Sequence, residues 1–332
     1  MFAIIGIVMV FGAVIGGFLM EKGPLPVLLQ PAELLIIGGA GIGTLLVANP
    51  LCIIKKLIAG LLGVLKGSKF KKTVYIESLK MMYELLNKAR RQGLVALESD
   101  IEEPDKSPIF TKYKSFTSDH HLRDFVCDTM RMAVTGGVDP FDVDQMMDLD
   151  MEVHHGEITQ PVAALTTVAD SLPGLGIVAA ALVGTFLGIL LCYGAVGPLA
   201  ANMDKLVAEE HAYYYVLRVV MIAFMKGISP LLAVEIGRRA IPGYVRPSFA
   251  EVEKACREAG SGAAAATAEA ERSNRRARGL GEGESATARP HHHQESQWSR
   301  RKVCGSNCWS PRRALSSTAA APTSMIAAKN CW

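Results

Sequence analysis

The chain has 332 residues, of which half are hydrophobic, and a formal net charge of +3. The hydrophobic residues are gathered in long uncharged blocks, so the chain is not a pair of ordinary soluble domains. Its seven cysteines are scattered and odd in number, which excludes a disulfide framework and fits reduced thiols.

Two uncharged runs open the chain, at 2–20 and 34–54, with 19 and 21 residues. Each is long enough to be a transmembrane helix, which takes about 20 residues. Six lysines follow between 55 and 72, whereas the loop at 21–33 holds one lysine. Because cytoplasmic loops of membrane proteins are rich in lysine and arginine, we expect the residues from 55 onward to lie in the cytoplasm.

The range 55–170 is predicted to be a cytoplasmic helical domain. Asp119 is placed to cap a helix that ends at the glycine pair 136–137. Asp139 is placed to cap a further helix that begins at Pro140. No run of alternating β-branched residues indicates a sheet. The predicted fold class is an all-α membrane protein, a helical transmembrane bundle with an inserted helical cytoplasmic domain.

The range 171–203 contains 33 residues without a charged side chain. It is too long for one span and too short for two spans with a turn, which would take about 45 residues. A single helix would place the range 204–258 outside the cell. A hairpin of two half-length helices would keep that range inside, but it would expose backbone ends to lipid.

The range 204–258 is predicted to be helical, with a core-facing stripe of five residues at helical spacing. These residues are Tyr213, Leu217, Val220, Phe224 and Ile228. The range 259–332 carries a net charge of +6 from 11 basic and 5 acidic residues and has few large aliphatic residues, so we expect a disordered basic tail. Its histidines 291–293 and the pair Cys304 and Cys308 match no zinc signature, and no metal site is predicted. Its arginines do not indicate a nucleic-acid site.

Motifs typical of enzymes are missing, and the histidine pairs 120–121 and 154–155 point apart on their helices. The apolar runs instead carry three small-residue faces on which helices can pack closely. Their glycines are Gly12, Gly16, Gly39, Gly43, Gly184 and Gly188. No acidic or basic residue lies inside the runs, since Glu33 and Asp170 lie at their ends. If the protein conducts protons, we expect a partner to supply the membrane carboxylate.

A series of segments in order along the chain resembles the MotA family of flagellar motor stator proteins, within the wider group that includes TolQ and ExbB. The match covers about residues 1–258. Its main segments are QPAELLIIGG at 30–39, KARRQG at 88–93, DSLPGLGIV at 170–178, LVGTFLG at 182–188 and RPSF at 246–249.

The resemblance implies a multi-pass protein of the bacterial inner membrane that uses protons as its coupling ion and has no other cofactor. Several copies would surround a MotB-like partner whose membrane aspartate carries the proton, and the assembly would push on the rotor switch ring. Arg90 and Glu98 match the family's rotor-facing charges. Pro173 and Pro198 match its two channel-side prolines, and Thr185 matches its channel-lining threonine.

The sequence departs from the family where Ala180 runs directly into Ala181. Family members complete a third span there and cross an outer loop before the fourth span begins. We therefore expect 171–203 to be a fused third and fourth segment left by an internal deletion, with impaired conduction. Two alternatives are a proton-driven energiser of envelope transport, of the ExbB or TolQ type, and a non-conducting membrane scaffold.

Overall fold

The computed structural model describes residues 2–22, 30–178 and 182–260. Every regular element in these ranges is a helix, as the predicted all-α class requires. The tail beyond residue 260, with its histidines and its cysteine pair, lies outside the described residues.

The first two apolar runs form three helices rather than two. Helix α1 spans Phe2–Met20, the predicted bounds, and α3 spans Pro31–Ala48. The predicted helix at 34–54 is interrupted by Pro50, which begins α4, Leu51–Lys66. The residue before a proline is driven out of helical geometry, and Asn49 is accordingly extended, with φ −133° and ψ 141°.

The polar part of the chain folds around one hydrophobic core. We call this part of the chain the soluble domain. It contains α5 (Lys72–Gln92), α6 (Glu98–Glu102) and α8 (His120–Thr135). The Asp119 carboxylate accepts a hydrogen bond from the amide of Leu122 at 3.2 Å. Gly136 ends α8 with φ 73°, a left-handed geometry that glycine adopts without strain.

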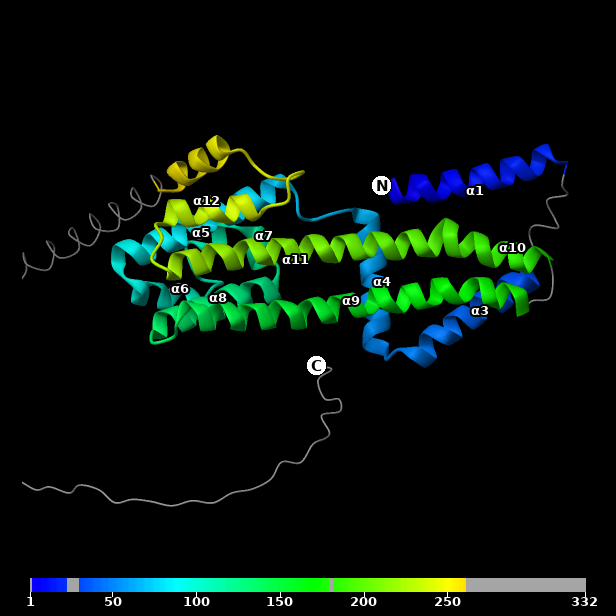
Figure 1. The fold of residues 1–332 in the computed structure, drawn as a ribbon, viewed down its shortest axis with the longest axis horizontal. Coiled ribbons are helices and arrows are strands. Elements are labelled where there is room, and N and C mark those ends of the chain that lie inside the picture. The colour runs from blue at the N-terminus through cyan, green and yellow to red at the C-terminus, as the bar shows by residue number, and fades with distance from the viewer. Residues whose placement is uncertain (1, 23–29, 179–181, 261–332) are drawn as a thin grey trace, which may run out of the picture. The chain divides into compact units, whose positions relative to one another are not determined.

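Two long antiparallel helices connect the soluble domain to the apolar end of the chain (Figure 1). Helix α9, Pro140–Val178, begins directly after Asp139 in the sequence and continues without a break through residue 170. The chain then returns through α10 (Leu182–Leu191), a π-helical turn (Cys192–Val196) and α11 (Gly197–Met225). The described residues of 171–203 thus lie on two antiparallel helices.

The return of the chain places 204–258 against the soluble domain. Tyr213, Leu217 and Val220 of the predicted stripe are at most 2% exposed, and they share one core with α5 and α8. Helix α12, Pro230–Ala240, and a final helix at 249–260 pack into the same core. A shared core requires both polar segments to lie on one side of the membrane, so the single-helix alternative is wrong.

Candidate functional site

The hairpin between α9 and α10 is held by direct backbone contact. A Cβ atom added to Gly188 would lie 2.5 Å from the carbonyl oxygen of Leu172. One added to Gly176 would collide with the carbonyl oxygen of Gly184 and lie 3.1 Å from the Cα of Thr185. The face at 184 and 188 therefore packs within the chain, and Gly176, which the sequence reasoning missed, is its counterpart on α9.

The two arms of the hairpin are full-length rather than half-length. The α9 arm begins with the apolar residues that follow Pro161, and from there to Val178 it is about 27 Å long. The returning arm from Val183 to Met203 is about 31 Å long. Both match a hydrocarbon core of about 30 Å. By length and composition, the apolar arm of α9 thus extends back to Pro161, nine residues before the predicted boundary at 170.

This extension moves Asp170 from the end of an apolar run to its middle. Asp170 lies nine residues after Pro161 and eight before Val178, and its side chain is exposed in the single chain. Pro173 follows on the same helix face, since residues three apart are neighbours. The apolar stretch of α9 therefore includes one carboxylate, which the uncharged run 171–203 does not. An acid within a spanning helix is costly and typical of ion pathways.

The two prolines predicted for the channel lie at different depths. Pro173 is adjacent to the contact between Leu172 and Gly188, and Pro198 is close to Ala200, which clusters with Val162. Pro198 therefore lies at the level of Val162, which is about 16 Å from Pro173 along the axis of α9. Pro198 directly follows the π-helical turn, in which the amide of Gly197 donates to the carbonyl of Cys192. Proline lacks the N–H that would continue a regular helix, which accounts for the irregular turn before it.

Glu33 is a buried acid in the first turn of α3. Its side chain is 4% exposed, and neither carboxylate oxygen has a hydrogen-bond partner among the described residues. The positive end of the helix dipole favours a carboxylate in this position.

The remaining predicted packing glycines leave open faces on α1 and α3. A Cβ atom added at any of them would meet no described atom within 4 Å, the positions being Gly12, Gly16, Gly39 and Gly43. Small residues of this kind allow a further helix to approach closely.

The residues predicted to face the rotor are both exposed and lie near one end of the soluble domain. Arg90 lies in the last turn of α5, and Glu98 begins α6. A buried network supports the turn between them. The Asp100 carboxylate accepts hydrogen bonds from the Lys88 ammonium at 2.5 Å and from the Ser107 hydroxyl at 2.7 Å. Sequence reasoning did not identify this support, because it joins residues on three segments.

A histidine cluster joins α8, α9 and α11. His121 and His154 come from different histidine pairs of the sequence, and their ring centroids lie 3.8 Å apart. The Tyr214 hydroxyl lies 3.3 Å from His121 Nδ1, and Glu210 lies 3.1 Å from His154 Nε2. No spacing in the sequence indicates these contacts, since they depend on how three helices pack. Within the described ranges, no three His, Cys, Asp or Glu side chains are grouped to hold a metal.

These features define a class of protein. Three described helical stretches are long and apolar enough to cross a membrane, and α1 is a further apolar helix. The chain is an all-helical, multi-pass membrane protein whose spanning hairpin continues into a soluble helical domain.

Comparison with known proteins identifies the family. Residues 4–93 match the family model "Motility protein A N-terminal". Motility protein A of Salmonella typhimurium is 37% identical over 281 positions, which cover 77% of this chain and 95% of that protein. Chemotaxis protein LafT of Vibrio parahaemolyticus is 31% identical, with 75% and 96% covered.

Two solved structures have the same fold. The C. jejuni MotAB structure has a TM-score of 0.59 at 18% identity and covers 74% of this chain and 98% of that chain. The flagellar MotAB stator complex from Bacillus subtilis has a TM-score of 0.56 at 24% identity, with 73% and 95% covered. The chain belongs to the motility protein A family of flagellar motor stator proteins, and it is a motor component rather than an enzyme.

Proposed function

We propose that this chain couples proton flow across the bacterial inner membrane to torque on the flagellar rotor. The observation that carries the proposal is the continuity of α9 and α11, which run from the hairpin into the core of the soluble domain. A displacement at Asp170 or Pro173 is transmitted along α9 because a helix in a close-packed core moves as a unit.

The soluble domain faces the cytoplasm in this proposal. The lysine-rich segment at 55–72 supports that orientation, since basic loops remain on the cytoplasmic side. Arg90 and Glu98 then lie on the domain that meets the rotor switch ring. Both are exposed and free to interact with charged residues of a partner.

A MotB-like partner completes the channel, within a homo-oligomer of this chain. The similar solved structures are MotAB complexes of their own organisms. In this chain the open glycine faces of α1 and α3 offer surfaces for additional helices. The partner's membrane aspartate carries the proton, while Asp170 and Thr185 belong to the part of the path formed by this chain.

The alignment with a relative shows that this chain lacks some of the aligned positions. About 256 residues of this chain, 77% of 332, align over 281 positions with the Salmonella protein, so about 25 positions have no counterpart here. This supports the internal deletion that is expected where Ala180 runs directly into Ala181. We propose that the deletion impairs conduction, because the hairpin that remains places Asp170 at mid-depth.

Complementation tests the proposal. The chain is expressed with a MotB-like partner in a bacterium that lacks its own stator, and swimming is measured. We expect membrane-localised complexes with weak or no swimming, and normal swimming would contradict impaired conduction.

A second arm tests stator identity separately. The chain is expressed in a bacterium that retains its own stator. An assembling but weakly conducting subunit should slow swimming, and this effect should require the partner. If the chain folds but neither supports nor slows swimming, it is not a stator subunit.

A further inference from the structure

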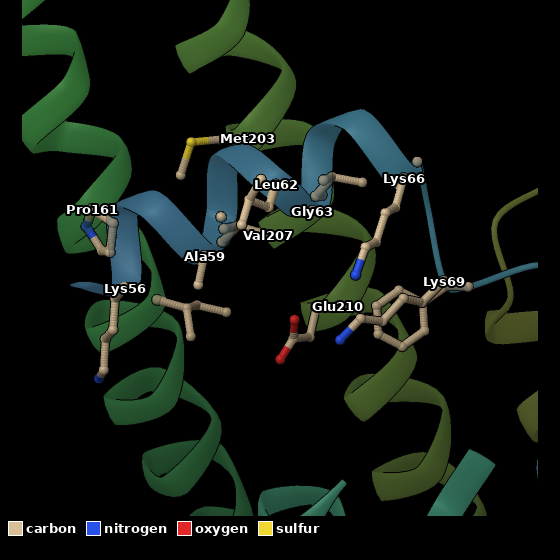
Figure 2. A pocket seen from close by; sticks show the side chains of 15 residues that line it. Lys56, Ala59, Leu62, Gly63, Lys66, Lys69, Pro161, Met203, Val207 and Glu210 are labelled. Carbon is tan, nitrogen blue, oxygen red and sulfur yellow. The ribbon is translucent and has the colours of Figure 1, made fainter. Parts of the chain in front are cut away.

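A cavity of about 530 Å³ lies where α4 crosses α9 and α11 (Figure 2). One part of its lining is apolar and includes Leu62, Met203 and Val207. The lining also contains three lysines and the single carboxylate of Glu210. The cavity is therefore apolar along one wall and net positive along another.

Two of the lysines point into the same space. Figure 2 shows the side chains of Lys66 and Lys69 directed toward the cavity from one side, opposite Glu210, while Lys56 points away. Lys56 pairs with Glu157 at 3.4 Å, and Glu210 lies against His154. Among the described residues, no carboxylate lies within 4 Å of the Lys66 or Lys69 ammonium group. Their charges are available to an anion.

Helix α4 has the features of a helix that lies on a membrane surface. It crosses α9 and α11 at a steep angle at the polar end of their apolar arms (Figure 1). Leu57 and Val64 are buried against those helices. A second apolar stripe faces outward and consists of Leu51, Ile58, Leu62 and Leu65. A helix with lysines beside an exposed apolar stripe is suited to the boundary between headgroups and acyl chains.

We propose that this cavity binds one anionic phospholipid. Its phosphate lies between the Lys66 and Lys69 ammonium groups, and an acyl chain follows the apolar wall from Val207 past Leu62. Leu62 belongs to both the cavity lining and the outward stripe, so an acyl chain leaves the cavity directly into the bilayer. A soluble phosphate would not use the apolar wall. This inference goes beyond the stator function and requires only that the hairpin spans the membrane.

The test measures bound lipid on the purified full-length chain. Native mass spectrometry and thermal melting are recorded with added phosphatidylglycerol, phosphatidylcholine or inorganic phosphate. The double variant Lys66→Gln/Lys69→Gln should bind phosphatidylglycerol roughly thirtyfold more weakly, since each lysine near an anionic lipid contributes about a factor of five. The control, Lys55→Gln/Lys71→Gln, removes the same charge from exposed lysines outside the cavity and should bind normally.

A second variant fills the space without altering charge. Gly63 lines the cavity, and a Cβ atom there would meet nothing within 4 Å, so Gly63→Phe should fold and exclude the lipid. Equal weakening by both lysine doubles would overturn the proposal, because it indicates general surface attraction. Stabilisation by inorganic phosphate alone would also overturn it. A third contradicting outcome is a change in oligomer mass in Gly63→Phe while lipid binding stays intact. That result would indicate that a second copy of the chain occupies the cavity.

Discussion

Gly188 on α10 lies against the backbone of Leu172 on α9, with room for a hydrogen atom but not for a methyl group. A Cβ atom at Gly188 would be 2.5 Å from the Leu172 carbonyl oxygen. We expect Gly188→Ala to destabilise the protein by about 1–3 kcal/mol, the usual cost of overpacking. Thermal melting in detergent measures the change. Gly174→Ala is the control, because its Cβ meets nothing within 4 Å on the same hairpin; equal loss in both variants would contradict the packing account.

The shared core predicts that Lys106 and Lys254 lie on the same side of the membrane, opposite Lys22. Cysteines introduced singly at these exposed positions should be labelled accordingly by a membrane-impermeant maleimide. Cys52 and the cysteines beyond residue 260 are replaced first.

The buried native cysteines can remain during this labelling. Burial raises the pKa of Cys127 and of Cys256 to about 12, so their thiolates are scarce at neutral pH. Labelling of Lys254→Cys only from the side that labels Lys22→Cys would refute the hairpin topology.

Asp100 is predicted to matter for the position of Glu98. Asp100→Ala would leave the Lys88 ammonium and the Ser107 hydroxyl without their buried acceptor, at a cost of about 2–4 kcal/mol. We expect lower thermal stability and faster amide hydrogen exchange at 94–102. Asp105→Ala removes an exposed pair with Arg123 and should cost at most about 1 kcal/mol. Unchanged exchange at 94–102 in Asp100→Ala would count against the proposed support.

The final helix at 249–260 should lose protection in acid. Ser248 and Glu251 form a capping box, in which the Ser248 amide donates to the Glu251 carboxylate at 2.7 Å. The ion pair with Lys72 and the bonds from Ser248 lower the pKa of Glu251 to about 2. Because the folded-state pKa is below the ordinary value of 4.5, this stabilisation is present above about pH 4.5 and is lost as the pH falls toward 2.

Hydrogen-exchange protection factors of the amides at 249–260, recorded as the pH is lowered, measure this loss of stabilisation. In Glu251→Ala the acid-dependent change should be absent, and protection should be low throughout. Glu253→Ala, on the same helix but outside the cap, should keep the wild-type pH profile. A wild-type profile in Glu251→Ala would assign the acid sensitivity to another group.

Local sequence patterns predicted several helix ends and one core-facing helix surface of this fold. Helices begin after Asp119 and Asp139, whose carboxylates cap them, and α8 ends at Gly136, as predicted. The predicted stripe that includes Leu217 packs in the core. The break at Pro50 was also accessible, since proline after Asn49 disfavours a continuous helix, but the length of the apolar run concealed it. These features depend on residues within one or two turns of each other.

The family and its membrane character followed from the sequence, because apolar run length and ordered motifs are local properties. The path of 171–203 did not, since a single helix and a hairpin satisfy the same local rules. The choice between them comes from distant contacts: the backbone approach of Gly176 to Gly184, and a core that holds Tyr213 against α5. The depth of Asp170 and the cavity beside Lys66 follow from that choice, because both require α9 and α11 to run side by side.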